Sequence, residues 1–250
     1  MSSLLLAFHR LGSLPYFYKL AGKWLPWVGG LSVVLFGFGL YIGLALAPTD
    51  YEQGDSYRII YVHVPAAWMS MLVYVVLAIT GAIALVWRLK LAEVVARASA
   101  PIGASYTFLA LATGSIWGKP MWGTWWVWDA RLTSELILLF LYLGYMALQW
   151  TIVDRRTAAR AGAILALVGV VNLPIIHYSV EWWSTLHQGP TVTKFDAPSI
   201  HLSMLIPLLL MALAFMVHFI TTVLARIRPE ILLREQHTQW VERLKFPQQS

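Results

Sequence analysis

Six long runs of apolar residues alternate with short polar stretches along the chain. The runs cover residues 27–47, 64–87, 101–116, 132–150, 161–178 and 199–225. Their lengths approach the roughly 20 residues that an α-helix needs to cross the hydrocarbon core of a bilayer. Backbone polar groups must be satisfied internally in lipid, so spanning segments of this length are helical. The pattern therefore predicts an all-α polytopic membrane protein with six transmembrane helices, forming one integral membrane domain over residues 1–250.

Basic residues are distributed unevenly between the two ends of the predicted helices. Of the 18 Lys and Arg residues, 14 fall in the N-terminal segment, the segments 88–97 and 155–160, and the C-terminal tail. The other 4 are Arg58, Lys119, Arg131 and Lys194. Because cytoplasmic segments carry the excess of Lys and Arg, we expect both termini in the cytoplasm. The segments expected to face the periplasm of a bacterial inner membrane are 48–63, 117–131 and 179–198.

Composition agrees with a membrane protein and excludes other classes. Charged residues make up 12% of the chain, against about 25% in soluble domains. The absence of cysteine excludes disulfides, thiolate chemistry and covalent cofactor attachment through CxxCH. No GxxxxGK[ST] sequence is present, so we expect any ATP hydrolysis to occur in another subunit and no enzymatic activity in this one. The first apolar run lacks a small-residue cleavage site, which argues against a cleaved signal peptide.

The stretch WGKPMWGTWWVWD, residues 117–129, holds five of the chain's 13 tryptophans. They are Trp117, Trp122, Trp125, Trp126 and Trp128. Its proline and two glycines argue against one long regular helix, so we expect a short, partly irregular platform of flat rings. Tryptophan is enriched at both membrane interfaces, and a simple belt would populate them about equally. The excess in one outer loop therefore favours binding of a large, apolar, planar ligand.

Four of the seven histidines lie near the same predicted outer side: His63, His177, His187 and His201. Neutral imidazole is a common axial ligand of haem iron. His63 and His187, from different loops, could hold an iron porphyrin against the tryptophans. Alternatively, His177 and His201 could ligate haem between two helices of an electron-transfer cytochrome b. Each histidine could also be an ordinary interfacial polar residue.

The remaining polar residues give weaker indications. Haem carries two propionates, which would require cations nearby, and the candidates are Arg58, Lys119 and Arg131. Arg131 could instead pair with Asp129 or Glu135. The histidines lack the short spacing of zinc sites, and the carboxylates are scattered rather than paired for acid–base work. His218, inside the last apolar run, is expected to be neutral and hydrogen-bonded to a neighbouring helix.

These motifs resemble the haem exporter protein C family of bacterial cytochrome c maturation, one of the tryptophan-rich, or WWD, haem-handling families. The resemblance rests on WGKPMWGTWWVWD followed by ARLTSE, on SYRIIYVHVPAAW around His63, and on NLPIIHYSVEWWSTLHQG around His187. It implies that these two histidines are the axial ligands of a b-type haem, bound non-covalently and transiently. It also implies that the tryptophans contact the haem. We interpret Asp129 as an orienting hydrogen-bond partner rather than a catalyst.

The resemblance also implies partners. They are an ATPase subunit, a second membrane subunit, a small single-span subunit, and a periplasmic haem chaperone, cytochrome c maturation protein E. The chain would present haem to this chaperone, which attaches haem through its own histidine, and ATP hydrolysis would release the loaded chaperone. The first three apolar runs contain almost no polar residues, which favours presentation over conduction of haem. The alternatives are the cytochrome b and a permease subunit whose tryptophans form only a belt. We expect contact with lipid and none with nucleic acid.

Overall fold

The computed structural model of the chain describes residues 12–189, 192, 194 and 197–245. Its helices are α2 (Leu14–Tyr41), α3 (Ile60–Trp87), α4 (Lys90–Trp122), α5 (Ala130–Thr151), α6 (Arg155–Gly169), α7 (Asn172–Trp182), α8 (Leu202–Arg234) and α9 (Gln239–Lys245). A π-helical turn, η1 (Ile42–Leu46), extends α2, and a 3₁₀ turn, η2 (Asp55–Ile59), leads into α3. Within the described residues, six helical segments are long and apolar enough to cross a membrane. The prediction of an all-α protein with six candidate spans is confirmed.

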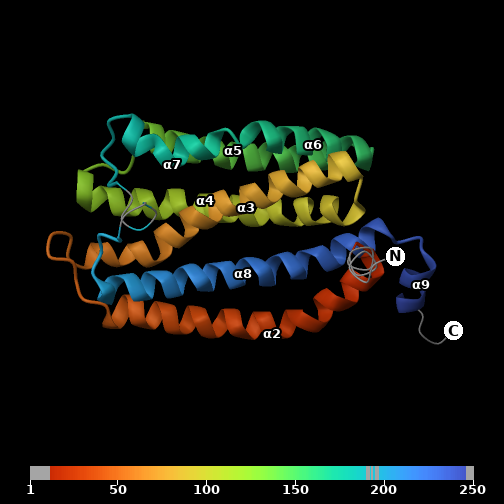
Figure 1. Ribbon diagram of the computed structural model, residues 1–250, viewed down its shortest axis with the longest axis horizontal. Helices are drawn as coiled ribbons and strands as arrows, with labels where there is room; N and C mark the ends of the chain where they lie inside the picture. Colours follow the sequence, from red (N-terminus) through yellow and green to blue (C-terminus); the bar gives the residue numbers. More distant parts are fainter. Residues whose placement is uncertain (1–11, 190–191, 193, 195–196, 246–250) are drawn as a thin grey trace.

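Three layers of helices make up the bundle (Figure 1). Helices α2 and α8 form one outer layer, α3 and α4 the middle layer, and α5, α6 and α7 the other outer layer. Buried tyrosines join the layers: Tyr142 donates to the carbonyl of Ser70 at 2.8 Å, and Tyr106 donates to that of Phe215 at 3.2 Å. The Tyr106 hydroxyl also lies 2.7 Å from Nδ1 of His218, which confirms that a neighbouring helix holds this histidine.

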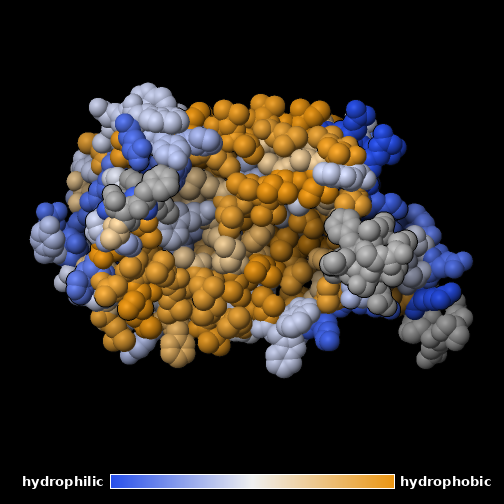
Figure 2. Space-filling model, viewed as in Figure 1, coloured by the Kyte–Doolittle hydropathy of each residue, from blue (hydrophilic) through white to orange (hydrophobic). Residues whose placement is uncertain are grey.

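The two ends of the bundle differ in what they contain. Helix α2 begins at one end of the bundle, beside α9, and we call this the termini end (Figure 1). The segments 47–54, 123–129 and 183–189 lie at the opposite end, which we call the loop end. Hydrophobic residues cover the middle of the surface, and hydrophilic ones gather toward both ends (Figure 2). This banding is what a bundle surrounded by lipid requires, because the middle of the bilayer offers no water to polar groups.

Helix α4 is much longer than the apolar run that predicted it. The run covered 101–116, whereas α4 extends from Lys90 to Trp122. Residues 90–100 are rich in alanine and other good helix formers, so the helix begins before the apolar signal does. The expectation that residues 88–97 connect two helices is therefore wrong for residues 90–97, which belong to α4. Arg88 ends α3 in the left-handed region, with φ of 53°, and α4 starts two residues later.

The expectation of an irregular tryptophan stretch is correct only for its second half. Residues 117–122 complete α4, although they include Gly118 and Pro120. The proline lies in the last turn, where its missing N–H removes a single helical bond, and the helix ends at the next glycine. That residue, Gly123, has φ of 76°, a conformation that glycine adopts without steric cost. The structure thus places Trp117 and Trp122 on a helix and the other three tryptophans in the segment after it.

The fifth apolar run forms two helices, α6 and α7, rather than one. The break follows Gly169, where a Cβ atom would overlap the Tyr74 hydroxyl, so only glycine permits this close approach. On the other side of the break, Asn172 donates from Nδ2 to the carbonyl of Ser134 at 2.8 Å. This bond fastens the start of α7 to α5. It also sets the direction from which the segment carrying His187 reaches the loop end.

Candidate functional site

A pocket opens at the loop end, between α3, α4, α5 and the segment after α7. Its empty volume, including the space open to solvent, is about 1310 Å³. We call it the histidine pocket, because His63 and His187 both line it. Its apolar walls include Val64, Ala67, Met71, Leu111, Leu132 and Ile176. Most of the wall is thus apolar, with a few polar groups, as in pockets that bind small molecules and cofactors.

His63 lies in the first turns of α3 and is only 9% exposed. Its Nδ1 atom is 3.0 Å from the carbonyl of Ala110 and 3.1 Å from Oγ1 of Thr113, both on α4. A carbonyl can only accept, so Nδ1 carries the proton and Nε2 is left with a lone pair. A hydrogen bond from the far nitrogen to a carbonyl is the arrangement that orients metal-binding histidines. His63 is therefore held as a neutral imidazole with one nitrogen available as a ligand.

His187 lies in the segment after α7, outside the helices. Burial, together with the nearby Arg131 and His63, lowers the pKa of this imidazole to about 3. The ring is therefore neutral at neutral pH, the form in which imidazole binds metals. Its ring centroid lies 5.4 Å from that of Trp122, at an interplanar angle of 73°. In the described part of the chain, neither ring nitrogen of His187 has a hydrogen-bond partner.

The two imidazoles come together although 124 positions separate them in the sequence. Their ring centroids are 6.2 Å apart, and their planes differ by 21°. Imidazoles that ligate one metal ion from opposite sides, with metal–nitrogen bonds of about 2 Å, have centroids about 6 Å apart. The pair thus has the separation that a shared, doubly ligated ion requires. The described residues contain no group of three His, Cys, Asp or Glu side chains that could hold a metal ion by themselves.

The tryptophans divide into two groups around this pair. Trp117 and Trp122 line the histidine pocket, and the ring of Trp117 stands edge-on to His63 with centroids 5.7 Å apart. Trp117 also donates from Nε1 to Oε1 of Gln53 at 2.9 Å, which fixes its ring against the loop before η2. Trp125 and Trp128 are 57% and 75% exposed and do not line the pocket. The five rings do not form one continuous platform.

Asp129 connects the tryptophan segment to the segment that carries His187. Its Oδ1 atom accepts from the backbone N–H of Leu132 at 2.8 Å and so caps α5. Its Oδ2 atom accepts from the Thr185 hydroxyl, and the Thr185 oxygen in turn accepts from the backbone N–H of His187 at 3.1 Å. We call this chain of bonds the Asp129–Thr185 bridge. It ties the segment that carries His187 to the start of α5.

Arg131, in the first turn of α5, lines the histidine pocket. Two carboxylates near it have other partners: Asp129 forms the bridge, and Glu135 accepts from the Ser70 hydroxyl at 2.8 Å. Among the described residues, Arg131 forms no ion pair within 4.0 Å, so the suggested pairing of Arg131 with either carboxylate is not what the structure shows. A guanidinium without an ion-pair partner is therefore available to an anion in the pocket.

The other predicted cations do not reach the pocket. Arg58 donates from Nη1 to the carbonyls of Gly43 and Leu44, at 3.2 and 2.9 Å, and its Nε pairs with Asp55 at 2.9 Å. It therefore satisfies the end of η1, where helix carbonyls lack backbone partners. Lys119 donates to the carbonyl of Gly123 at 2.9 Å and so satisfies a carbonyl at the end of α4. The structure assigns both residues to helix ends.

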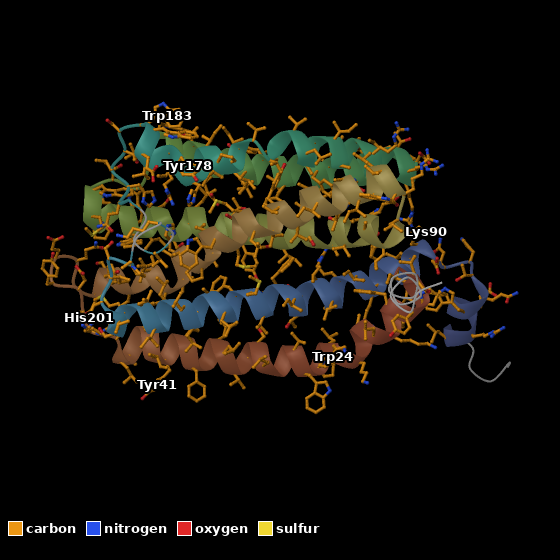
Figure 3. All side chains as sticks on the ribbon, viewed as in Figure 1. Trp24, Tyr41, Lys90, Tyr178, Trp183 and His201 are labelled. Carbon is orange, nitrogen blue, oxygen red and sulfur yellow. The ribbon has the colours of Figure 1, made fainter. Side chains whose placement is uncertain are left out.

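His177 and His201 are not brought together. His177 lies on α7 against the ring of Tyr178, with centroids 4.7 Å apart. His201 is exposed at the start of α8, where its Nδ1 accepts from the backbone N–H of Ser203 at 3.3 Å. Figure 3 shows Tyr178 and His201 in different layers of the bundle. The geometry therefore does not favour a haem ligated by these two histidines.

A family model described as heme exporter protein C matches residues 7–242 of the chain. The chain belongs to the heme exporter protein C family. The protein of that name from Escherichia coli strain K12 is 54% identical over 236 residues, 94% of this chain and 95% of its own length. The one from Haemophilus influenzae is 54% identical over 227 residues, 91% and 92% of the two chains. The one from Bradyrhizobium diazoefficiens is 55% identical over 218 residues, 87% and 82% of the two.

In this member of the heme exporter protein C family, the sequence reasoning missed the residues that support the ligands. Thr113 bonds to His63, and Gly114 leaves room for its ring, since a Cβ atom there would lie 2.9 Å from Cε1 of His63. Ala110, Gly114 and Gly118 recur every fourth residue, which marks one face of a helix with small side chains. If α4 had been predicted to continue through Gly118, this spacing would have indicated close packing on this face of the helix.

Proposed function

We propose that this chain binds haem in the histidine pocket, with His63 and His187 as its axial ligands. The observation that carries the proposal is the pair of neutral imidazoles, 6.2 Å apart, in one largely apolar pocket. The porphyrin supplies four nitrogen ligands to its iron, so two imidazoles complete the coordination without further protein ligands. Trp117 and Trp122 would contact the ring, and the absence of cysteine restricts the chain to a non-covalently bound, b-type haem.

We further propose that the bound haem is handed on rather than retained. The pocket opens at the loop end, and the exposed rings of Trp125 and Trp128 lie in the segment that joins α4 to α5 there. Exposed aromatic rings are typical of surfaces that bind other proteins. The recipient in this proposal is the periplasmic haem chaperone, cytochrome c maturation protein E. The excess of Lys and Arg toward the termini end supports an inner-membrane protein with the loop end in the periplasm.

The chain would act within an export and release complex for the biogenesis of c-type cytochromes. An ATPase subunit, a second membrane subunit and a small single-span subunit would complete it. The chain itself would contribute the haem pocket and no enzymatic step. The exposed apolar residues along the membrane-embedded parts of α2 and α6 leave ample surface for such partners, as in other assemblies of apolar helices. Release of the loaded chaperone would depend on ATP hydrolysis in the partner.

Haem retention and donation test this function directly. The complex purified from haem-replete cells is expected to carry haem with an absorption spectrum of two axial imidazoles. Added haem-free chaperone is expected to acquire that haem, while a chaperone lacking its attachment histidine is not. A correctly folded complex that retains no haem under these conditions would instead support the permease alternative. Haem that stays with the chain and is never donated would support an electron-transfer cytochrome.

Arg131 and Arg58 are expected to affect different properties of the protein. Arg131→Gln removes the cation in the pocket and is expected to weaken haem binding about tenfold, because a hydrogen bond to a charged group contributes roughly 1.5–3 kcal/mol. Arg58→Gln removes the cap of η1 and is expected to lower the melting temperature while haem binding stays near that of the parent protein. Haem titration and thermal unfolding in detergent measure the two effects.

Haem dimethyl ester, in which both propionates are neutral, identifies the group that Arg131 recognises. If it binds propionates, haem dimethyl ester should bind the parent protein and Arg131→Gln with similar affinity. A full tenfold loss that persists with the ester would contradict the assignment. Equal losses of haem from Arg58→Gln and Arg131→Gln would show that Arg58 also reaches the pocket.

A further inference from the structure

A second cavity lies at the termini end of the bundle, between the end of α3, the start of α4 and the start of α6. Its empty volume, including the space open to solvent, is about 720 Å³. Three arginines line it: Arg88, Arg156 and Arg160. We call it the arginine cavity. It is separated from the histidine pocket by the length of the helices, and nothing in the proposed function uses it.

The three arginines differ from two other basic residues nearby, Lys90 and Arg97. Among the described residues, none of the three forms a side-chain hydrogen bond or an ion pair within 4.0 Å. Their neighbours, in contrast, have such partners. Arg97 pairs with Glu230 at 3.1 Å, and Lys90 lies 3.9 Å from Glu235. The arginine cavity therefore concentrates cations that the protein itself leaves without ion-pair partners.

The acidic residues near the cavity do not neutralise it. Glu93 lines the cavity, but its carboxylate is paired with Arg234 from α8. Asp154 caps α6, where its Oδ1 accepts from the backbone N–H of Thr157 at 2.8 Å and from the Thr157 hydroxyl at 2.6 Å. With both carboxylates engaged, the cavity keeps an excess of positive charge. Guanidinium groups bind phosphate with parallel, charge-assisted hydrogen bonds, so an oxyanion is the ligand that fits.

The rest of the cavity wall and its surroundings are apolar. Ala84, Leu85 and Ala159 line it. Two exposed tryptophans, Trp87 at 66% and Trp150 at 77%, lie in the last turns of α3 and α5, at the same end of the bundle. Tryptophan favours the boundary between hydrocarbon and water, so the cavity lies at the depth of lipid headgroups. The hydrophobic band of the surface ends in hydrophilic side chains toward this end of the bundle (Figure 2). A ligand here could place a charged group among the arginines and an acyl chain along the band.

We propose that the arginine cavity binds a phosphate group, presented by the headgroup of an anionic phospholipid. Basic pockets between transmembrane helices are suited to such headgroups, and each basic residue near the surface strengthens the attraction. A bound lipid would bridge the end of α3 and the start of α6, whose arginines would otherwise repel one another. The proposal is independent of haem binding, because it concerns the opposite end of the bundle.

Native mass spectrometry of the detergent-solubilised chain, mixed with phosphatidylglycerol or phosphatidylcholine, tests the proposal. The double variant Arg156→Gln/Arg160→Gln is expected to retain about 25-fold less phosphatidylglycerol than the parent, since each cation near the surface contributes roughly a fivefold factor. The variant Lys23→Gln/Arg226→Gln is the matched control. It removes two exposed cations from α2 and α8 that do not line the cavity. Equal loss in both variants would overturn the proposal, since it would show only general attraction to positive charge.

Inorganic phosphate separates the two possible sources of the phosphate group. Millimolar phosphate is expected to leave phosphatidylglycerol bound to the parent protein, because the acyl chains add apolar contact along the band. Complete displacement of the lipid by phosphate at this concentration would contradict a lipid ligand and indicate a soluble phosphate. Equal retention of phosphatidylcholine and phosphatidylglycerol by the parent would also contradict the proposal.

Discussion

Replacing either His63 or His187 with alanine is expected to lower the affinity for haem by at least about tenfold, since losing only a partner behind a metal ligand already costs about 10–100-fold. The two substitutions should also change the absorption spectrum in the same way, because each leaves the iron with one protein imidazole instead of two. The reason is the geometry of the pair: both rings line one pocket, with centroids 6.2 Å apart. Haem titration of the purified variants, followed by absorption spectroscopy, measures both effects.

Two kinds of control separate ligation from a structural role of these histidines. His177→Ala and His201→Ala alter histidines at the same end of the bundle that do not line the pocket, and both should bind haem like the parent. Exogenous imidazole should restore the parent spectrum to His63→Ala and His187→Ala, because it can occupy the vacated position. If His177→Ala loses haem while His63→Ala retains it, the assignment of the ligands is wrong. If imidazole restores neither spectrum, the histidines support the pocket without binding iron.

The positions of the membrane helices could be predicted from the sequence because hydropathy reports directly on lipid contact. Helix ends could not, since they depend on residues that lie beyond the apolar core. Residues 90–100 continue α4 because alanine-rich segments form helix wherever a preceding turn permits, and hydropathy does not record this. Hydropathy also does not record the close approach of the Tyr74 hydroxyl to Gly169, since this contact joins helices that are far apart in the sequence.

The candidate site, like the fold, could be predicted from the sequence only in part. Residue chemistry proposed His63 and His187 as one of two possible haem-ligating pairs, because only a few side chains can ligate iron and four histidines lie near this end. Their separation, however, depends on the packing of α3 on α4 and on the path of the segment after α7. Arg58 and Arg131 look equivalent as outer cations in the sequence. Only the structure shows that one completes the end of η1 while the other faces the pocket.

The position of His187 depends on a bond network rather than on a helix, and this has a consequence for binding. His63 is held by α3 and by its bond to α4, whereas His187 lies in a segment with no helical bonds of its own. The Asp129–Thr185 bridge provides the missing restraint, since it joins that segment to the first turn of α5. Ligands that must be ordered at the moment of binding reduce affinity, so a preformed bridge should favour haem.

Breaking the bridge is therefore expected to weaken haem binding although neither ligand is changed. Thr185→Val keeps the shape of the side chain but removes the hydroxyl that bonds to Asp129 and accepts from the His187 N–H, and we expect a loss of about tenfold or more in affinity. Thr185→Ser keeps the hydroxyl and should bind haem like the parent. Melting temperatures should be similar for both, because Thr185 lies outside the helical core.

Asp129→Asn tests the other half of the bridge. The carboxylate accepts from two donors through two oxygens, the Leu132 N–H and the Thr185 hydroxyl, whereas an asparagine amide offers a single acceptor oxygen. Asparagine caps helices about as well as aspartate, so α5 should keep its stability while the charge-assisted bond from the Thr185 hydroxyl is lost. Haem affinity should then fall toward that of Thr185→Val, and the double variant should fall no further than Thr185→Val, because both changes act on the same bond. If Asp129→Asn and Thr185→Val bind haem and load the chaperone like the parent, then the bridge does not position His187 and the charge of Asp129 is not needed.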